Sequence, residues 1–198
     1  MVIRPVREDD LSATLDIYTY YTENTAISFD YAAPTIDEWR EKMRKTLEKY
    51  PYFVAEEDGK ILGYTHVSPF KGRPAYDWSV ETTIYVAPDC RRGGVGRALY
   101  EALEQALKKQ GITNMYACIG VPERDDEYLT HDSVYFHEKM GFTLCGTFRK
   151  CGRKFDRWYD MVWMEKIIGE ITFTNCINDS TLMQILRERL CEMIMQKQ

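Results

Sequence analysis

One stretch of the chain combines arginine and glycine in a pattern suited to binding a phosphate group. It lies between a predicted strand and a predicted helix and consists of Arg91, Arg92, Gly93, Gly94, Val95, Gly96 and Arg97. Its glycines permit positive φ and close approach of the backbone to a ligand. Free N–H groups in the first turn of the following helix favour an anion. The stretch therefore predicts a pyrophosphate site, although a glycine-rich turn that merely starts a helix would have the same pattern.

Two ionisable side chains in neighbouring segments are candidates for proton transfer. Glu81 lies in a predicted strand over 77–88, where alternation places it on one face with Thr83 and Tyr85. His137 lies in a predicted short helix over 133–141. A carboxylate with an ordinary pKa near ~4.3 is a weak base, whereas histidine can donate or accept a proton at neutral pH. The plainer interpretations are a solvated strand carboxylate and a packed histidine.

The order of strand, loop and helix resembles the acetyl-CoA loop of the GNAT-type N-acetyltransferase superfamily. Arg91, Gly94 and Gly96 stand at the defining positions of that loop. Several longer segments, in the same order, resemble the phosphinothricin acetyltransferase branch, and they are residues 25–43, 48–64, 76–86, 133–142 and 148–165. The resemblance covers residues 1–167.

This resemblance implies a fold and a reaction. The fold would be mixed α/β, with a central, mostly antiparallel twisted sheet and helices on both faces. Acetyl-CoA would be the cosubstrate, and a free amine would attack its thioester carbonyl directly. Glu81 would be the general base, acting through water, and His137 would take part in proton transfer in a direction that the sequence leaves open.

The resemblance also implies cofactor contacts beyond the loop. Tyr85 and Val86 precede the loop on the strand that the family uses for this purpose. The branch usually has an asparagine a few residues before the histidine, and this chain has none there. Thr130, Asp132 and Ser133 occupy that region instead, so we expect one of them to replace the contact.

An amino-acid-like substrate needs cations or N–H donors for its acidic group and walls for its side chain. Four polar candidates for the acidic group are Arg73, Tyr76, Lys150 and Arg153. Phe29 and Trp158 could form the walls of the pocket. For each of these six residues, a structural or solvated role is the alternative.

Three functions are compatible with these residues. The first is acetylation of a small amino-acid-like amine, such as phosphinothricin or methionine sulfoximine or sulfone. The second is the same chemistry on a protein N-terminus or lysine, which would need an open groove. The third is an acyl-CoA-binding module without turnover, against which the presence of Glu81 and His137 counts. Relatives of this type are commonly dimers, so we expect a homodimer.

Composition limits the other possibilities. The chain has 198 residues and a net charge of −5, which disfavours nucleic acid as the main partner. The six cysteines and three histidines show no metal-ligand spacing. No segment approaches the ~18 apolar residues of a membrane span, and the first residues lack the apolar core of a signal peptide. We therefore expect no metal, no membrane partner, and a cytoplasmic protein with free thiols.

These side chains must be positioned by alternating strands and helices. The predicted strands cover 2–6, 51–57, 60–69, 77–88, 114–120, 142–151 and 157–166, with a tight turn at Asp58-Gly59. The first predicted helix begins at 9, and three more cover 35–50, 95–111 and 133–141. The helix over 35–50 begins with a Thr35/Glu38 capping box. We expect a catalytic domain over 1–167.

The remainder, 168–198, is expected to be an extension with an amphipathic helix that begins at Asp179. This helix could pack on its own domain or form an oligomer contact.

Overall fold

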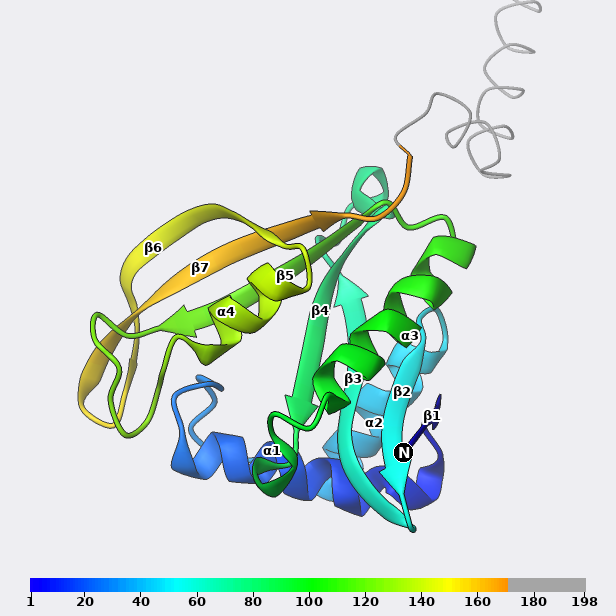
Figure 1. Ribbon diagram of the computed structural model, residues 1–198, viewed down its shortest axis with the longest axis horizontal. Helices are drawn as coiled ribbons and strands as arrows, with labels where there is room; N and C mark the ends of the chain where they lie inside the picture. Colours follow the sequence, from blue (N-terminus) through cyan, green and yellow to red (C-terminus); the bar gives the residue numbers. More distant parts are fainter. Residues whose placement is uncertain (171–198) are drawn as a thin grey trace, which may run out of the picture. The chain divides into compact units, whose positions relative to one another are not determined.

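Seven strands form one sheet in the computed structural model, which describes residues 1–170 (Figure 1). The strands are β1 (Val2–Pro5), β2 (Tyr52–Glu57), β3 (Lys60–Pro69), β4 (Ser79–Val86), β5 (Asn114–Val121), β6 (Thr143–Lys154) and β7 (Arg157–Ile167). Their order in the sheet is β1-β2-β3-β4-β5-β7-β6. Only β4 and β5 pair in parallel, and every other neighbouring pair is antiparallel. The predicted, mostly antiparallel sheet is confirmed.

Within residues 1–170, four α-helices accompany the sheet, and they are α1 (Leu11–Asn24), α2 (Ile36–Leu47), α3 (Val95–Lys109) and α4 (Asp132–Lys139). The alternation of β2 shows that helices cover both faces. Val54 packs in a cluster with residues of α1 and α2, whereas the next residue, Ala55, packs with Val95 and Leu99 of α3. Because successive side chains of a strand point to opposite faces, α1 and α2 lie on one face and α3 on the other.

Local sequence signals account for where these elements begin and turn. Thr35 caps α2, since its Oγ1 accepts from the Glu38 amide at 3.3 Å while its own amide donates to the Glu38 carboxylate at 2.8 Å. Between β2 and β3, Asp58 and Gly59 both have positive φ, 50° and 79°, as a two-residue type I′ turn requires. The predicted capping box and hairpin are both confirmed.

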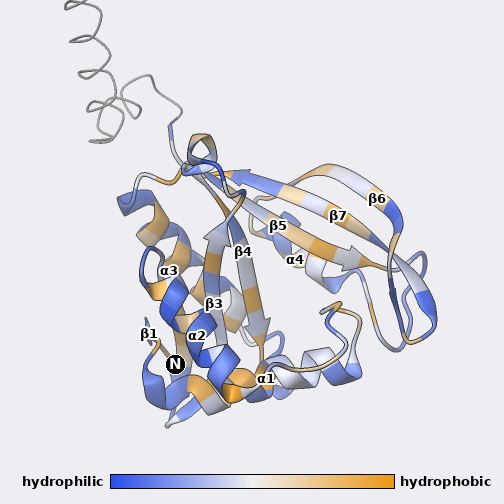
Figure 2. Cartoon of the chain, turned by 180° about the vertical axis from the view of Figure 1, so that it is seen from behind, coloured by the Kyte–Doolittle hydropathy of each residue, from blue (hydrophilic) through white to orange (hydrophobic). Residues whose placement is uncertain are grey.

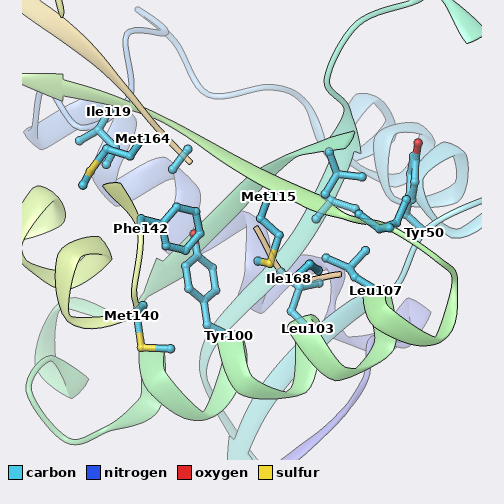
Figure 3. Close-up of a cluster of buried hydrophobic side chains, with 14 of the residues drawn as sticks. Tyr50, Tyr100, Leu103, Leu107, Met115, Ile119, Met140, Phe142, Met164 and Ile168 are labelled. Atoms are coloured by element: carbon cyan, nitrogen blue, oxygen red, sulfur yellow. The ribbon is translucent and has the colours of Figure 1, made fainter. Parts of the chain in front are cut away.

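The apolar face of α3 builds the largest core cluster. Leu103 and Leu107 are fully buried, in a cluster that also contains Met115 of β5 and Met164 of β7 (Figure 3). The other side of the same helix carries hydrophilic residues, as Figure 2 shows. This periodicity predicts the helix. At its N-terminal end, after the glycine-rich loop, Val95 and Leu99 pack in another cluster with Ala55 of β2.

The closing hairpin differs from expectation in its length. The sequence predicts that the sixth strand ends at Cys151, but β6 continues to Lys154. The pairing of β6 with β7 shifts between Phe148 and Gly152, and Lys150 within this bulge has φ +47°. The two extra residues of this bulge break the alternating pattern that sequence reasoning follows.

The chain divides into two units, Met1–Ile168 and Gly169–Gln198. The predicted helix from Asp179 lies in 171–198, outside the described residues, and the proposed boundary at 167 stays a prediction. Within residues 1–170, no helix is long and apolar enough to span a membrane. Within the same range, no three histidine, cysteine or carboxylate side chains form a group that could hold a metal ion.

Candidate active site

A cleft opens where β4 and β5 separate. The two strands pair only at Ser79–Asn114, Val80–Met115 and Glu81–Tyr116, and beyond these pairs they diverge (Figure 1). The cleft has a volume of about 310 Å³, and its walls are residues 81–85 of β4 and 117–120 of β5, together with side chains from α1, α3, α4 and the segment after α1. A parallel pair that splits in this way exposes strand backbone and side chains to a ligand without breaking the rest of the sheet.

Glu81 is the last residue of β4 that pairs with β5, and it lines the cleft. Partial burial raises the pKa of its carboxyl, and the positive charge of Lys71 acts in the opposite direction. A raised pKa makes the carboxylate a better proton acceptor than an exposed glutamate. Glu81 therefore lies in the cleft with a raised pKa, and its role as a general base stays a prediction.

The predicted faces of β4 are also observed. Glu81 pairs across the sheet with Ser68, and Tyr85 pairs with Tyr64 and contacts its ring, on the face that carries α1 and α2. Val80 packs on the other face in the cluster with α3. Tyr85 lines the cleft.

Cys118 faces the same cleft from β5. Desolvation, followed by the negative charge of Glu81, raises the pKa of its thiol to about 11. The thiol is therefore protonated at neutral pH and does not compete with an amine as a nucleophile.

His137 is buried on α4 and also lines the cleft. Its Nδ1 donates to the Ser133 carbonyl at 2.7 Å, so the Nε2 of the neutral ring is an acceptor, and the Tyr100 hydroxyl lies 2.9 Å from it. Burial lowers the pKa of His137 to about 4. The imidazole is therefore neutral at neutral pH and is not a cationic acid.

Tyr100 is a cleft residue that sequence reasoning missed. Its hydroxyl also lies 3.0 Å from Oγ1 of Thr82, and that oxygen lies 3.0 Å from the Tyr116 carbonyl of β5. A chain of hydrogen bonds therefore runs from β5 through β4 and α3 to α4 at the point where the strands part. Burial raises the pKa of Tyr100, so its hydroxyl keeps its proton. The only sequence signal was a tyrosine on the buried side of an otherwise aliphatic helix.

The glycine-rich loop leads into α3 with a left-handed residue as its cap. Gly94 is the N-cap at φ +81°, and Arg92 has φ +65°. Of the three glycines in the loop, only Gly94 has positive φ. Gly96 instead allows close packing, because a Cβ there would lie 3.1 Å from the ring of Phe136 and the ring would have to shift. The first-turn amides of α3 have no intrahelical acceptor and are free for an anion.

The cations of the loop differ in their surroundings. The Nε of Arg91 donates to the Tyr21 hydroxyl at 3.2 Å, and its guanidinium lies over the Tyr21 ring at 5.2 Å. All three arginines are exposed, and only Arg91 has this contact with Tyr21. The same Tyr21 hydroxyl donates to the carbonyl of Val86, so Tyr21 joins the end of β4 to the loop.

Of the three candidates before His137, the structure brings Ser133 to the cleft. Thr130 accepts from the Asp132 amide at 3.4 Å, and Asp132 is exposed at the start of α4. Neither of these two lines the cleft. Their predicted cofactor contacts stay predictions.

Of the six candidates for the amine substrate, only Phe29 lines the cleft. Lys150, Arg153 and Trp158 lie at the far end of the β6–β7 hairpin, where Arg153 pairs with Trp158 across the strands and its guanidinium bonds Asp156. These three side chains are exposed.

Arg73 and Tyr76 lie in the segment between β3 and β4, and both are exposed. The structure adds Lys71 from the same segment, whose Nζ lies 4.7 Å from the Phe70 ring and close enough to Glu81 to lower its pKa. Nothing in the sequence distinguishes this lysine from the other lysines.

Comparison with known proteins agrees with this geometry. The sequence profile described as an acetyltransferase (GNAT) domain matches residues 3–163. A phosphinothricin N-acetyltransferase of Streptomyces viridochromogenes is 35% identical over 164 residues, which are 83% of this chain and 86% of that protein. An L-methionine sulfoximine/L-methionine sulfone acetyltransferase of Salmonella typhimurium is 28% identical over 173 residues, 86% of this chain and 96% of that protein.

Among solved structures, a GNAT superfamily phosphinothricin acetyltransferase from Sinorhizobium meliloti, in complex with AcCoA, is similar with a TM-score of 0.78. It is 30% identical, and the match covers 85% of this chain and 89% of that one. The chain belongs to the GNAT acetyltransferase family. The family and the fold predicted from the sequence are confirmed.

Proposed function

We propose that this protein transfers the acetyl group of acetyl-CoA to the amino group of a small, amino-acid-like substrate in the cleft between β4 and β5. The observation that carries the proposal is Glu81, a carboxylate of raised pKa at the point where the strands part. The names of the relatives support the choice of substrate, since they act on phosphinothricin and on methionine sulfoximine or sulfone.

The reaction forms one bond and breaks another at the thioester carbonyl carbon. The ammonium group of the substrate first loses a proton to Glu81 through a water molecule. The free amine then attacks the carbonyl, the new N–C bond forms, and the C–S bond breaks. The nitrogen releases its second proton, and the departing thiolate takes up one. Acid–base assistance of this kind contributes about 10²–10⁴-fold in rate.

We assign protonation of the departing thiolate to Tyr100. Its hydroxyl keeps its proton and lines the cleft, so it can donate to the departing sulfur. His137, which is neutral, accepts the hydroxyl proton at rest through Nε2, 2.9 Å away. This proton would turn to the sulfur as the thiolate departs, and the proton that the nitrogen releases would replace it. In this assignment His137 orients the donor and does not protonate the thiolate itself.

The pyrophosphate of acetyl-CoA would bind to the loop before α3. The free amides of the first helical turn after Gly94 and the exposed side chains of Arg92 and Arg97 would supply donors and positive charge. Arg91 would contribute less directly, because its guanidinium lies on Tyr21. Ser133 would approach the cofactor from α4.

The acidic group of the substrate would face Lys71, with Arg73 and Tyr76 in the same segment as additional donors. Phe29 would form a wall of the part of the cleft that binds the amine substrate. Lys150, Arg153 and Trp158 are close to that wall in the fold, since Phe29 packs against Gly152 of β6. A cleft of about 310 Å³ suits a small amine better than a folded protein surface.

We further propose a homodimer that works in the cytoplasm. The edge strand β6 supports an interface, because it closes one side of the sheet and is exposed along most of its length, with Leu144 60% and Phe148 54% exposed. A Leu144→Lys variant should shift the sedimentation of the protein to that of a monomer, whereas Leu47→Lys, on α2, should not. The thiols of Cys90, Cys118, Cys145 and Cys151 are free, which fits a reducing compartment.

A substrate panel tests the proposed reaction. Release of free CoA thiol should be followed with acetyl-CoA and each of phosphinothricin, methionine sulfoximine, methionine sulfone, the common amino acids, and a short peptide with a free N-terminus. We expect turnover with one or more of the small amino acids and at least ~10-fold lower kcat/KM with the peptide, a difference of about 1.4 kcal/mol. Turnover only with the peptide would select the protein acetyltransferase function, and no turnover at all would select a binding module.

A further inference from the structure

The segment that follows α1 forms one wall of the cleft and is fixed by the last residues of β6. Phe29 of this segment lies between two glycines that leave room for its ring. A Cβ on Gly152 of β6 would lie 2.4 Å from Phe29 Cε2, and a Cβ on Gly120 of β5 would lie 3.2 Å from Cζ. Cβ atoms in proteins essentially never lie within 3.0 Å of such a neighbouring heavy atom. Only glycine at 152 therefore allows the observed position of the ring.

Lys154, two residues further along β6, is buried although lysine rarely is. It is 3% exposed, and its Nζ donates to the Thr22 carbonyl at 2.6 Å and to the Ser28 carbonyl at 2.7 Å. The ammonium also lies 5.3 Å from the centre of the Phe155 ring. These two carbonyls bracket the turn between α1 and Phe29, so one side chain of β6 holds both ends of the turn.

The energetic cost of this arrangement indicates a specific use. Desolvation lowers the pKa of Lys154, and the charge of Asp30 acts in the opposite direction. Burial of an ammonium group is unfavourable unless it is paired or well hydrogen-bonded. An apolar residue would fill the same space without that cost, but it could not bind two carbonyl groups.

We infer that Lys154 is a positioning residue for the amine substrate, because it holds the segment 22–30 so that Phe29 and Asp30 face the cleft. Both of these residues line the cleft. Asp30 is fixed further by the Tyr18 hydroxyl, which donates to its carboxylate. The glycine-rich loop before α3 contains none of these contacts. The inference rests on the proposed function in one respect, namely that the amine occupies this side of the cleft.

The test compares kinetic constants for the two substrates in full-length variants. Lys154→Met keeps the length of the side chain and removes its donors. It should raise the KM for the amine by at least ~10-fold and leave the KM for acetyl-CoA within ~2-fold. Lys109→Met, an exposed lysine at the end of α3, is the matched control and should change neither constant. Equal changes in both KM values, or no change in either, would overturn the inference.

A second pair of variants links the effect to Phe29 and does not depend on the stability of Lys154→Met. Gly152→Ala should displace the ring and raise the KM for the amine, with no change for acetyl-CoA. When either variant is combined with Phe29→Ala, the change in the amine KM, expressed as a free energy, should be smaller than the sum of the two single-variant changes. Both substitutions act through the same ring. Full additivity would overturn the inference.

Hydrogen exchange separates this inference from the proposed function. The amides of residues 25–30 should exchange at least ~10-fold faster in Lys154→Met than in wild type, and those of α3 should not. If no amine is acetylated by the wild type, the proposed function fails, and the exchange result still decides whether Lys154 holds the segment. Unchanged exchange of 25–30 would show that it does not.

Discussion

The hydroxyl of Tyr100 lies 2.9 Å from Nε2 of His137, and this pair joins α3 to α4 in the lining of the cleft. Because Nδ1 of His137 donates to a carbonyl, Nε2 has no proton of its own. The phenol proton therefore lies between the two residues or points to Thr82. Because Thr82 donates its own proton to the Tyr116 carbonyl, the one phenol proton of Tyr100 is shared between two acceptors, Nε2 of His137 and Oγ1 of Thr82.

The first prediction follows from this pairing. Tyr100→Phe should lower kcat by ~10–10²-fold while the KM for acetyl-CoA stays within ~3-fold, because it removes a proton donor and little packing. His137→Gln should lower kcat as well, and the double variant should be no slower than Tyr100→Phe alone. Single-turnover rates at saturating acetyl-CoA provide the measurement. If the two losses multiply instead, His137 acts on the reaction independently of Tyr100.

The second prediction concerns the loop before α3. Gly94→Val places a β-branched residue at φ +81°, where it is strained, and should raise the KM for acetyl-CoA by at least ~10-fold, about 1.4 kcal/mol. Gly111 provides a matched control at the other end of α3. It has φ +78°, and, as at Gly94, a Cβ there would meet nothing within 4 Å. Gly111→Val should lower the melting temperature similarly and leave the cofactor KM unchanged. Equal effects of both variants on that KM would assign the loop a structural role.

The third prediction uses the pKa of Glu81. Burial raises this pKa, so the acidic limb of the kcat profile should lie above the ordinary range of a glutamate, with activity lost as pH falls through it. Lys71 opposes the shift. Lys71→Met should therefore move the limb to higher pH, and Lys71→Arg should restore it. A limb that stays in place in Lys71→Met would mean that another group titrates.

The fourth prediction concerns stability in acid. Burial lowers the pKa of His137 to about 4 and that of His66 to about 3, from 6.5. Between about pH 6.5 and 4 the unfolded chain binds protons at these sites and the folded chain does not. The free energy of unfolding should therefore fall as pH falls, by up to about 1.4 kcal/mol per pH unit for each histidine.

Urea titrations across this range measure the slope. His137→Gln should reduce it by about one proton relative to wild type, and adding His66→Phe should reduce it by about one more. Glu81 is present in all three proteins, so its contribution to the slope cancels when each variant is compared with wild type. A slope that is the same in all three proteins would contradict the assignment of neutral, buried imidazoles.

Much of this architecture follows from local sequence patterns. The capping box at Thr35, the Asp58-Gly59 turn and the apolar stripe of α3 are short-range signals, and each forms as predicted. The faces of β4 follow from alternation alone. The glycine loop and the longer family segments indicate where the cofactor would bind.

Other features depend on contacts between distant segments. Tyr100 and His137 meet only in the folded chain, since 37 positions separate them in the sequence. Lys154 reaches a carbonyl 132 residues away, and no local pattern predicts a buried lysine. Trp158 and Arg153 have suitable side chains, but the bulge and turn of the β6–β7 hairpin set where they point. Residue type suggests chemistry, and only tertiary structure decides which residues share a cleft.

The most direct test of acetyl transfer at this cleft is the mass of the product. Wild type and Glu81→Gln should each be incubated with acetyl-CoA and the best amine of the panel, and the reaction products should be separated and weighed by mass spectrometry. We predict an amine heavier by one acetyl group in place of one hydrogen, formed ~10²–10⁴-fold more slowly by Glu81→Gln, with cofactor binding retained. An unmodified amine, or equal rates for the two proteins, would contradict the account.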